Sequence, residues 1–400
     1  MAKGFRHAGH APSLAAALIH FDVSFLCWVL LGALGAYVAS DLGLSPTQKG
    51  LMVAVPPLGG AGFRLLLGTL SDRVGLKRLG LTSLALTLVP LLWGATLATS
   101  FVQVLGVGLL LGLAGASFAV ALPLASRWYP PEHQGLALGI AGAGNSGTVI
   151  AALAAPRLAE HVGWHGTFAL AMIPVALAWI AFAVLAKEPP RAAAGGGGGP
   201  LSLLREGDPR WLCAFYLVTF GGFVGLSGYL PIFFVDRFEL TKVTAGAFAA
   251  LCAVTGSLLR PLGGALADRL GGTRVLTMVL VVAGCLAAVL STLPRLGLTV
   301  ALLATLLGLL GMGNGAVFQL VGCRVPERVG AMTGLVGAAG GVGGFLLPFG
   351  FGWLASVTGA FTAGFAVFAV VAGGAAVAVV GRDRAWQVGP RPVQVAELAA

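Results

Sequence analysis

Residues 64–78 read Arg64-Leu-Leu-Leu-Gly-Thr-Leu-Ser-Asp-Arg-Val-Gly-Leu-Lys-Arg78, and residues 260–274 read Arg260-Pro-Leu-Gly-Gly-Ala-Leu-Ala-Asp-Arg-Leu-Gly-Gly-Thr-Arg274. The two stretches lie 196 residues apart and share arginine, glycine, aspartate, arginine, glycine and arginine at matching positions. A second match, with a spacing of 195 residues, pairs Pro131, Glu132, Gly135, Gly139 and Gly142 with Pro326, Glu327, Gly330, Gly334 and Gly337. The chain is therefore predicted to consist of two parallel repeats of one unit.

The composition around these stretches is that of a membrane protein. Of the 400 residues, 58% are hydrophobic and only 10% are charged, with a mean hydropathy of +0.94. Soluble domains carry roughly 25% charged residues, which cover a solvated surface. Soluble enzymes, nucleic-acid modules and disulfide scaffolds are therefore disfavoured, and the five cysteines lack the paired spacing of a metal site.

Twelve runs are apolar and long enough, at about 20 residues, to span a bilayer as helices. They are 14–40, 49–70, 79–99, 101–125, 135–158 and 164–186, then 211–235, 243–266, 275–293, 297–323, 330–356 and 360–380. The segment between the sixth and seventh runs contains five consecutive glycines flanked by prolines, which is typical of a flexible connector. We expect an all-α membrane protein with a six-helix bundle over 1–186, a linker over 187–209, a second bundle over 210–381 and a tail over 382–400.

The basic residues predict the orientation of the chain. With the N-terminus placed inside, 17 of the 24 Lys and Arg residues fall in cytoplasmic segments and five fall in outer loops. Because Lys and Arg collect in cytoplasmic loops, both termini of this multi-pass protein are predicted to lie on the cytoplasmic side of the cell membrane. The two bases that remain, Arg64 and Arg260, lie inside apolar runs.

These two arginines are predicted to lie near the middle of the membrane. Each precedes an aspartate, Asp72 or Asp268, by eight residues, which is about 12 Å along a helix. An arginine at that depth costs roughly 2.5 to 3.5 kcal/mol on insertion scales and usually serves function. Each could pair with a buried carboxylate, but among 14 acidic residues only Asp22 lies inside an apolar run, near the helix end. An anionic substrate is the simpler counter-ion, and a guanidinium suits planar oxyanions.

Two parallel six-helix halves joined by a linker resemble the major facilitator superfamily, in which the halves rock about a central substrate site. The loop Gly68-x-x-x-Asp72-Arg73-x-Gly75-x-Lys77-Arg78 is similar to that superfamily's loop between helices 2 and 3, and its second copy departs only at Thr273. The resemblance implies that the loop carboxylates close the cytoplasmic side against helix ends of the other half. The residues concerned are Asp72, Arg73, Asp268 and Arg269, with Arg127 and Arg324 as partners. From the residues alone, a solvated charged turn is the alternative.

A finer resemblance is to the nitrate/nitrite porter family of that superfamily. It rests on Ala141-Gly-Ala-Gly-Asn145-Ser-Gly147, on the glycine-rich 337–344, and on Gly115-Ala-Ser-Phe118 and Tyr216-Leu-Val-Thr-Phe-Gly-Gly222. It implies a substrate site formed by Arg64, Arg260, Phe118, Tyr216, Asn145 and Gly144. The second copy of the signature lacks an asparagine, so an amide contact is expected from one half only. From the residues alone, the two aromatic side chains fit a packing role and Asn145 fits helix–helix contact.

We therefore expect a secondary transporter of nitrate and/or nitrite that works by alternating access, with no enzymatic activity, cofactor or metal. Exchange of the two anions is slightly favoured over nitrate/proton symport, because mid-membrane carboxylates are scarce. His20 and Asp22 are candidate proton carriers, although a solvated helix-end role suits them better. A carrier for another small organic anion such as oxalate is the main alternative, and the repeat with its gating loops disfavours a channel or a receptor.

The expected partners are nitrate, nitrite, protons in the case of symport, and the lipid bilayer. No nucleic acid is expected, and the chain is expected to be a monomer. Asn314 and Gln319 are polar enough to line a central cavity, but no motif assigns them a role.

Overall fold

The computed structural model describes residues 8–190, 200–325 and 328–388, which form helices joined by short loops, without a strand among them. The first half contains α2 (Ala11–Ala33), α3 (Gly35–Asp41), α4 (Pro46–Val74), α5 (Leu76–Thr96), α6 (Phe101–Gly115), α7 (Phe118–Ser126), α8 (Pro131–Gly142), η1 (Ala143–Ser146) and α9 (Gly147–Leu185). The second half contains η2 (Pro200–Arg205), α10 (Gly207–Phe238), α11 (Lys242–Leu270), α12 (Gly272–Leu290), α13 (Leu296–Arg324), α14 (Val329–Thr358) and α15 (Thr362–Val388).

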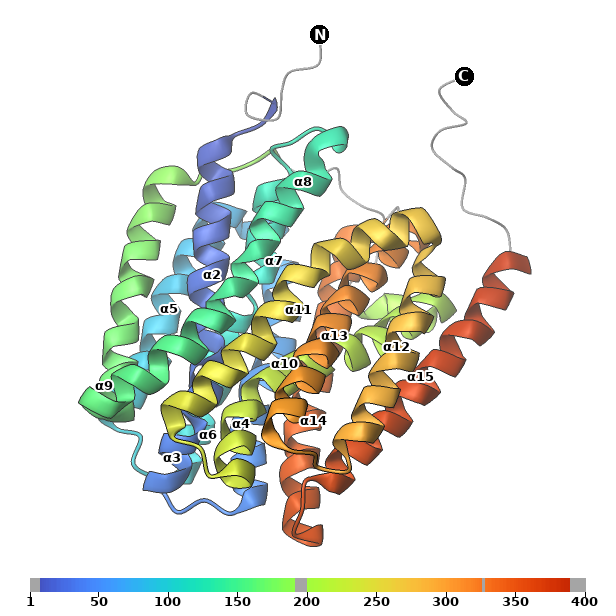
Figure 1. Cartoon of the computed structure of the whole chain (residues 1–400). Coiled ribbons are helices and arrows are strands. Elements are labelled where there is room, and N and C mark those ends of the chain that lie inside the picture. Colours follow the sequence, from blue (N-terminus) through green and yellow to red (C-terminus); the bar gives the residue numbers. More distant parts are fainter. Residues whose placement is uncertain (1–7, 191–199, 326–327, 389–400) are drawn as a thin grey trace, which may run out of the picture.

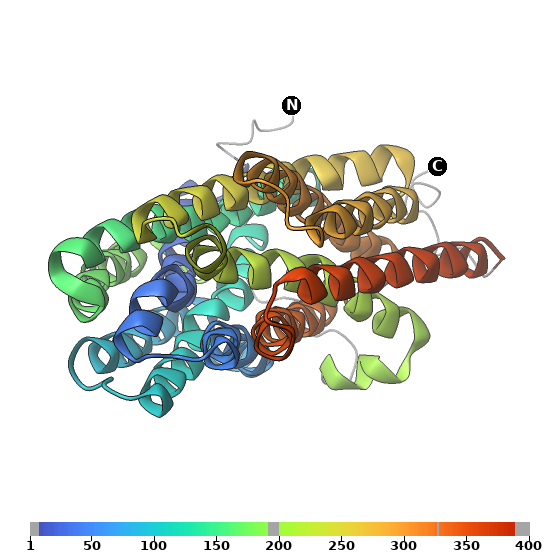
Figure 2. The ribbon, with the colours of Figure 1, turned by 60° about the horizontal axis from the view of Figure 1, so that its bottom comes forward.

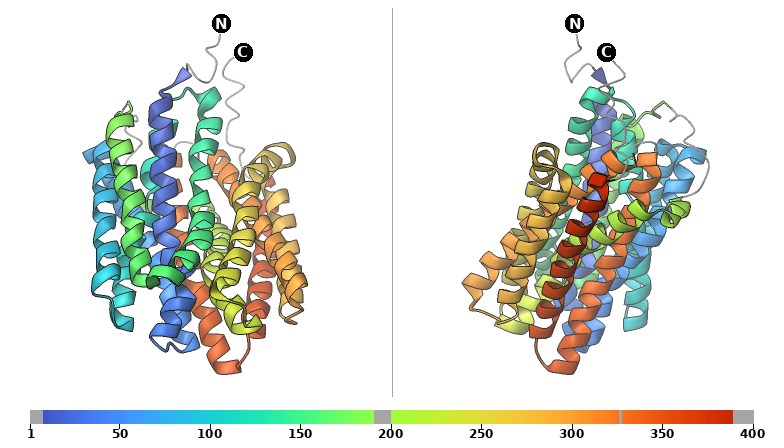
Figure 3. Two further views of the ribbon diagram at one scale, coloured as in Figure 1. Left: turned by 60° about the vertical axis from the view of Figure 1, so that its left-hand side comes forward. Right: turned by 90° about the vertical axis from the view of Figure 1, so that its right-hand side faces the viewer.

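Eleven helical stretches of the described residues are long and apolar enough to cross a membrane. One of them, Ala137–Leu185, contains two crossings, because the non-helical torsion angles of Gly163 (φ 69°, ψ 173°) reverse the chain within it. Its two arms join at the lower end of the bundle (Figure 3). The described chain thus makes the twelve crossings that the apolar runs predict, and the all-α membrane fold is confirmed.

The two halves lie next to each other, as the colours of Figure 2 show. In Figure 1, α2 begins and α15 ends at the same end of the bundle, which we call the near end; the opposite end is the far end. The halves meet mainly where α4 packs along α14 and where α9 packs against α11. At the first of these contacts a Cβ atom on Gly50 would lie 2.5 Å from the carbonyl oxygen of Pro348, so only glycine allows the helices to approach this closely.

The repeat read from the sequence is also a repeat of local structure. Gly75 and Gly271, the second glycines of the two loop motifs, have φ of 92° and 91°, a backbone conformation that glycine adopts without strain. In each half, a carboxylate at the end of the last crossing or just after it binds the start of the helix that follows this glycine, α5 or α12. Glu188 accepts hydrogen bonds from the backbone N–H groups of Leu76 and Lys77 at 2.7 and 2.8 Å.

In the second half the corresponding carboxylate belongs to Asp383, which lies 195 residues after Glu188. It accepts a hydrogen bond from the Thr273 hydroxyl at 2.6 Å. Thr273 is the position at which the second loop copy departs from the expected base, and the hydroxyl supplies a donor in its place. The two repeats therefore share one way of fixing the start of their third helix.

The polar contacts between the halves of the described chain close its far end. Lys49 Nζ lies 2.7 Å from Asp236 Oδ2, and the Lys242 ammonium lies 4.5 Å from the centroid of the Tyr37 ring. Ring contacts of Trp28 with Phe220 and of Phe118 with Phe318 also cross between the halves, near the two intramembrane arginines. At the near end, Asp208 and Arg382 form an ion pair within the second half.

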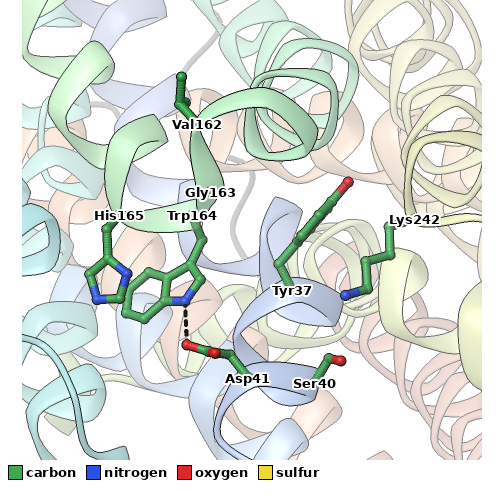
Figure 4. Close-up of a pocket in the computed structure, with 8 residues that line it drawn as sticks. All are labelled: Tyr37, Ser40, Asp41, Val162, Gly163, Trp164, His165 and Lys242. Carbon is green, nitrogen blue, oxygen red and sulfur yellow. Dashed lines mark hydrogen bonds between the residues drawn. The ribbon is translucent and has the colours of Figure 1, made fainter.

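A polar pocket of about 480 Å³ opens at the far end, between the two halves (Figure 4). Trp164 Nε1 donates to Asp41 Oδ2 at 2.9 Å on one side of it, and Lys242 approaches from the other half. Because the pocket walls come from both halves, its shape depends on the closure of the far end.

Removing the Lys49–Asp236 ion pair is expected to favour opening of the far end. Both side chains are partly exposed, and such pairs contribute at most about 1 kcal/mol, so a shift of a few-fold in population is expected. The probe is Ile232→Cys, a buried position that contacts Gly35 of the other half, in a background without the native cysteines. Asp236→Asn should raise its labelling rate by a thiol reagent two- to five-fold.

The control for this experiment is Arg237→Gln, which removes the neighbouring charge. Arg237 lies over the ring of Phe238 in its own half, so its loss should leave labelling at Ile232→Cys unchanged. Equal labelling rates in Asp236→Asn and the parent protein would show that the ion pair does not hold the far end closed.

Candidate functional site

The two intramembrane arginines occupy equivalent places in the two repeats. Arg64 lies 18 residues after Pro46, the first residue of α4, and Arg260 lies 18 residues after Lys242, the first residue of α11. At 1.5 Å per residue, both are about 27 Å from the far ends of their helices. Arg64 is buried, with 2% of its surface exposed, whereas Arg260 is half-buried. The structure thus brings two cations to one level between the halves.

Backbone carbonyl groups from both halves hold the Arg64 side chain. Its Nε donates to the carbonyl oxygen of Gly115 at 3.0 Å, and its Nη1 donates to that of Gly337 at 2.6 Å. Gly115 ends α6 in the first half, and Gly337 belongs to the glycine-rich stretch of α14 in the second half. Arg64 therefore links the two halves and keeps further N–H groups for another acceptor.

A break in the fourth crossing supplies the first of these carbonyls. The chain leaves regular α-helix at Ala116 and Ser117, between α6 and α7. There the N–H of Ala119 donates to the carbonyl of Ala116 at 2.9 Å. In a regular α-helix it would donate to the carbonyl of Gly115, four residues earlier. The Gly115 carbonyl is thereby left without its helical donor and is free to accept from Arg64.

Arg260 has a looser environment than Arg64. Its Nη2 lies 3.5 Å from the Tyr216 hydroxyl, which is the limit of a hydrogen bond, and its Cζ lies 5.5 Å from the Phe318 ring. Within the described chain, neither arginine forms an ion pair with a carboxylate. The alternative in which each arginine pairs with a buried acid is therefore not what the structure shows, and Arg260 keeps donors for a ligand.

Aromatic rings surround the pair of arginines. The Phe118 ring lies near both, with its centroid 6.0 Å from Cζ of Arg64 and 6.0 Å from Cζ of Arg260. Tyr216 stacks on Phe220 at 4.9 Å, and the Phe220 ring lies 5.2 Å from Cζ of Arg64. The negative faces of aromatic rings stabilise guanidinium groups.

Sequence reasoning named Phe118 and Tyr216 for this frame and missed three of its members. Trp28 and Phe220 lie beside Arg64, and Phe318 lies beside Arg260. Trp28 and Phe220 belong to apolar helices with several other aromatic residues, and Phe318 is a single aromatic residue in the apolar α13, so no local pattern marks any of them as a site residue. The spacing of four residues between Tyr216 and Phe220, which puts both on one helix face, is the one available signal.

The signature segment of the fifth crossing packs directly on α2. It forms the short 3₁₀ turn η1, in which Gly144 and Asn145 are buried. A Cβ atom on Gly144 would lie 2.7 Å from the Phe21 ring, so this glycine faces α2. The Asn145 amide forms no hydrogen bond with any other described residue, and its Oδ1 is buried. A ligand contact by Asn145 or by Gly144 stays a prediction.

The residues predicted to close the cytoplasmic side all lie at the near end: Asp72, Arg73, Arg127, Asp268, Arg269 and Arg324. Arg324 lies over the ring of Trp386 in its own half, at 4.5 Å. Asp268 is exposed and forms no ion pair within the described chain, and the side chain of Asp72 lies outside the described part. The latch stays a prediction for a state in which the near end is closed.

The two candidate proton carriers lie deeper than their helix-end interpretation implies. Asp22 is eleven residues inside α2, at the level of the signature segment, and accepts a hydrogen bond from the Ser146 hydroxyl at 2.5 Å. His20 is fully buried in the first half, where its Nε2 lies 3.2 Å from the Ser83 hydroxyl. His20 is therefore not a solvated boundary residue, whereas Asp22 is partly exposed, and neither contacts the arginines among the described residues.

A helical bundle of two parallel six-crossing repeats, with a site where the halves meet, is the construction of secondary membrane carriers. A profile of the Major Facilitator Superfamily matches residues 16–323 of this chain. The fold is similar to that of a bacterial homolog of the human lysosomal transporter Spinster in an inward-facing and occupied conformation. The TM-score is 0.74 at 16% sequence identity, with 95% of this chain and 98% of that chain covered.

Two curated relatives narrow the assignment. The "nitrite extrusion protein" of Bacillus subtilis is 33% identical over 349 residues, covering 87% of this chain and 88% of the relative. The "probable nitrate/nitrite transporter NarK2" of Mycobacterium tuberculosis is 34% identical over 348 residues, covering 85% and 88%. The chain belongs to the nitrate/nitrite porter family of the major facilitator superfamily, and it is a multi-pass membrane transporter.

Proposed function

We propose that this protein carries nitrate and nitrite across the cell membrane by alternating access, with Arg64 and Arg260 binding the anion from the two halves. The observation that carries the proposal is the pair of arginines at one level, without a carboxylate partner in the described chain, inside an aromatic frame. Nitrate and nitrite are small planar anions, and the planar donor set of a guanidinium matches them. The names of both relatives support the same two anions.

In this proposal the anion provides the negatively charged hydrogen-bond acceptor that each arginine lacks. Arg64 has two N–H groups bound to carbonyl oxygens, and Arg260 has one weak contact with Tyr216. An anion between them accepts hydrogen bonds from both guanidinium groups and removes the repulsion between two like charges. Phe118 and Tyr216 flank it, and Asn145 faces it from the signature turn. Because the arginines belong to different halves, a bound anion draws the halves together and lowers the barrier to reorientation.

The proposal includes an orientation and a division into moving parts. The excess of Lys and Arg in the segments at the near end supports a cytoplasmic near end, with both termini inside the cell. The bodies that move are the bundles over 1–186 and 210–381, joined by the linker over 187–209. The protein works as a monomer in the bilayer, since each chain carries both arginines.

Exchange of nitrate for nitrite is the proposed mode, in preference to proton symport. Supporting it, no carboxylate of the described chain forms an ion pair with either arginine, so a proton has no acceptor in direct contact with the anion. Without an anion, the carrier would have to close around two unneutralised guanidinium groups. Their mutual repulsion is strong where little water screens it, so this closed conformation is costly. An empty carrier therefore reorients slowly, and a loaded one reorients readily.

Vesicles with the purified protein test this mechanism. They are loaded with nitrite, nitrate or buffer alone, and uptake of external nitrate is measured at two external pH values. We expect uptake into vesicles that contain either anion, little into empty vesicles, and no stimulation by an inward proton gradient. Uptake into empty vesicles that follows the proton gradient would replace exchange by symport. Transport of oxalate with no transport of nitrate or nitrite would overturn the choice of substrate.

A further inference from the structure

Asn314 of α13 is a buried amide that the protein itself does not satisfy. Only 1% of its surface is exposed, its Oδ1 is buried, and its amide forms no hydrogen bond with any other described residue. An amide in this position loses its hydrogen bonds to water without replacement, which destabilises the fold. Leucine would fill the same volume without that cost. A polar residue at such a position is explained if an anionic ligand accepts hydrogen bonds from its amide N–H groups.

Asn314 lies at the level of the two arginines. It follows Leu296, the first residue of α13, by 18 residues, which is the spacing of Arg64 and Arg260 from the starts of their own helices. Because all three helices begin at the far end, the three residues lie about 27 Å from it. The backbones also touch: a Cβ atom on Gly315 would lie 2.3 Å from the carbonyl oxygen of Arg260.

The side chain of Asn314 belongs to the face of α13 that meets the aromatic frame. Leu310, Asn314 and Phe318 follow one another at intervals of four residues and therefore share one face. Leu310 approaches Gly222 of α10, and the Phe318 ring meets the Tyr216 ring edge-on at 5.2 Å. Asn314 lies between these two contacts, on the same face as the ring that lies beside Arg260.

The signature copy in the second half supplies no amide at this level. The residue 195 positions after Asn145 is Gly340 in α14. A Cβ atom on Gly340 would lie 2.7 Å from Cδ1 of Tyr216 and 2.7 Å from Cδ1 of Phe220, so rings fill the space that an asparagine needs. The second half thus has no equivalent of Asn145 in its signature copy, whereas Asn314 presents an unsatisfied amide from a neighbouring helix of that half.

We propose that Asn314 is an amide contact of the transported anion from the second half, complementing Asn145 from the first. The inference rests on the proposed function, since it takes a small planar oxyanion as the ligand. The amide N–H groups of Asn314 donate to an oxygen of the anion when Arg260 binds it. The anion then receives one guanidinium and one amide from each half, so both halves sense whether the site is occupied.

The experiment compares Asn314→Leu with the parent protein in vesicles and in detergent. Loss of one hydrogen bond to a charged ligand should raise KM for nitrate about tenfold or more. Melting temperature without ligand should stay the same or rise, because leucine removes an unsatisfied amide. The rise in melting temperature that nitrate produces in the parent protein should shrink. A structural role for Asn314 would instead lower the melting temperature and leave KM unchanged.

Ser227→Ala is the matched control. Ser227 is also a buried polar residue without a described partner, but it lies eleven residues from the far end of α10, about 10 Å along the helix from the level of the arginines. This variant should keep the KM of the parent protein. An unchanged KM for Asn314→Leu in vesicles that do transport nitrate would overturn the inference alone. Parent vesicles that carry oxalate in place of nitrate would overturn the proposed substrate, and the same comparison of KM, made with oxalate, would then decide the role of Asn314.

Discussion

Replacing Arg64 by lysine is expected to abolish nitrate and nitrite transport although the positive charge remains. The guanidinium of Arg64 donates from Nε to the Gly115 carbonyl and from Nη1 to the Gly337 carbonyl, and these groups belong to different halves. Lysine ends in a single ammonium group that cannot reach both carbonyls and an anion in one plane. Losing even one charge-assisted hydrogen bond costs about 1.5 to 3 kcal/mol, which corresponds to roughly 10- to 100-fold.

Arg260→Lys is expected to abolish transport for a different reason. Arg260 forms only a weak contact with Tyr216 in the described chain, so most of its donors are available to the anion. The substitution removes the planar donor set from the second half while it leaves the packing nearly unchanged. Transport by both variants is measured as nitrate/nitrite exchange in vesicles, normalised to the amount of protein inserted.

Arg157→Lys is the matched control for both arginine variants. Arg157 is exposed near the far end of the fifth crossing, and its Nη1 donates to the Leu153 carbonyl of its own helix. This lysine variant should exchange nitrate at the rate of the parent protein. Normal exchange by Arg64→Lys or by Arg260→Lys would remove that arginine from the proposed site.

Hydropathy predicted the twelve crossings because each is continuously apolar, but it placed their ends poorly. The seventh run was expected over 211–235, whereas α10 spans Gly207–Phe238. The helix continues through charged residues because Asp208 accepts hydrogen bonds from Arg382 and Trp386 of the last crossing. Apolarity measures contact with lipid, whereas a helix ends where its backbone hydrogen bonds end.

The arginine pair could be predicted from the sequence because a charge inside an apolar run is conspicuous, and the repeat put both copies at one level. Their surroundings could not be predicted in the same way. The Gly115 carbonyl is available only because the helix breaks after it, and the Gly337 carbonyl comes from a segment 273 residues away from Arg64. Contacts through backbone atoms leave no mark on residue type, so sequence reasoning missed them.

The asparagine missing from the second signature copy leads to the second large expected effect. Asn145 and Gly340 are equivalent in the repeat, so Gly340→Asn restores the symmetry of the sequence. The structure predicts that this variant does not transport. The Cβ atom alone would lie 2.7 Å from both Tyr216 and Phe220, and both rings are buried, with 1% and 2% of their surfaces exposed. Stacked at 4.9 Å, the rings cannot move apart from each other without disturbing their neighbours.

The displaced rings would press on Phe318 and Trp28, which themselves lie beside the arginines. Overpacking of this kind typically costs about 1 to 3 kcal/mol, so the variant should still insert while its exchange falls to background.

Gly340→Ala should raise KM for nitrate, whereas Gly350→Ala on the same helix, where no atom lies within 4 Å of the added Cβ, should behave as the parent protein. Normal exchange by Gly340→Asn would mean that the two rings can move aside without harm. Steric exclusion would then not be the reason why the second half lacks an amide at this position. Loss of exchange confined to the Gly340 variants would instead show that the aromatic frame around Arg260 requires glycine at this position, and that an amide from the second half must come from another helix.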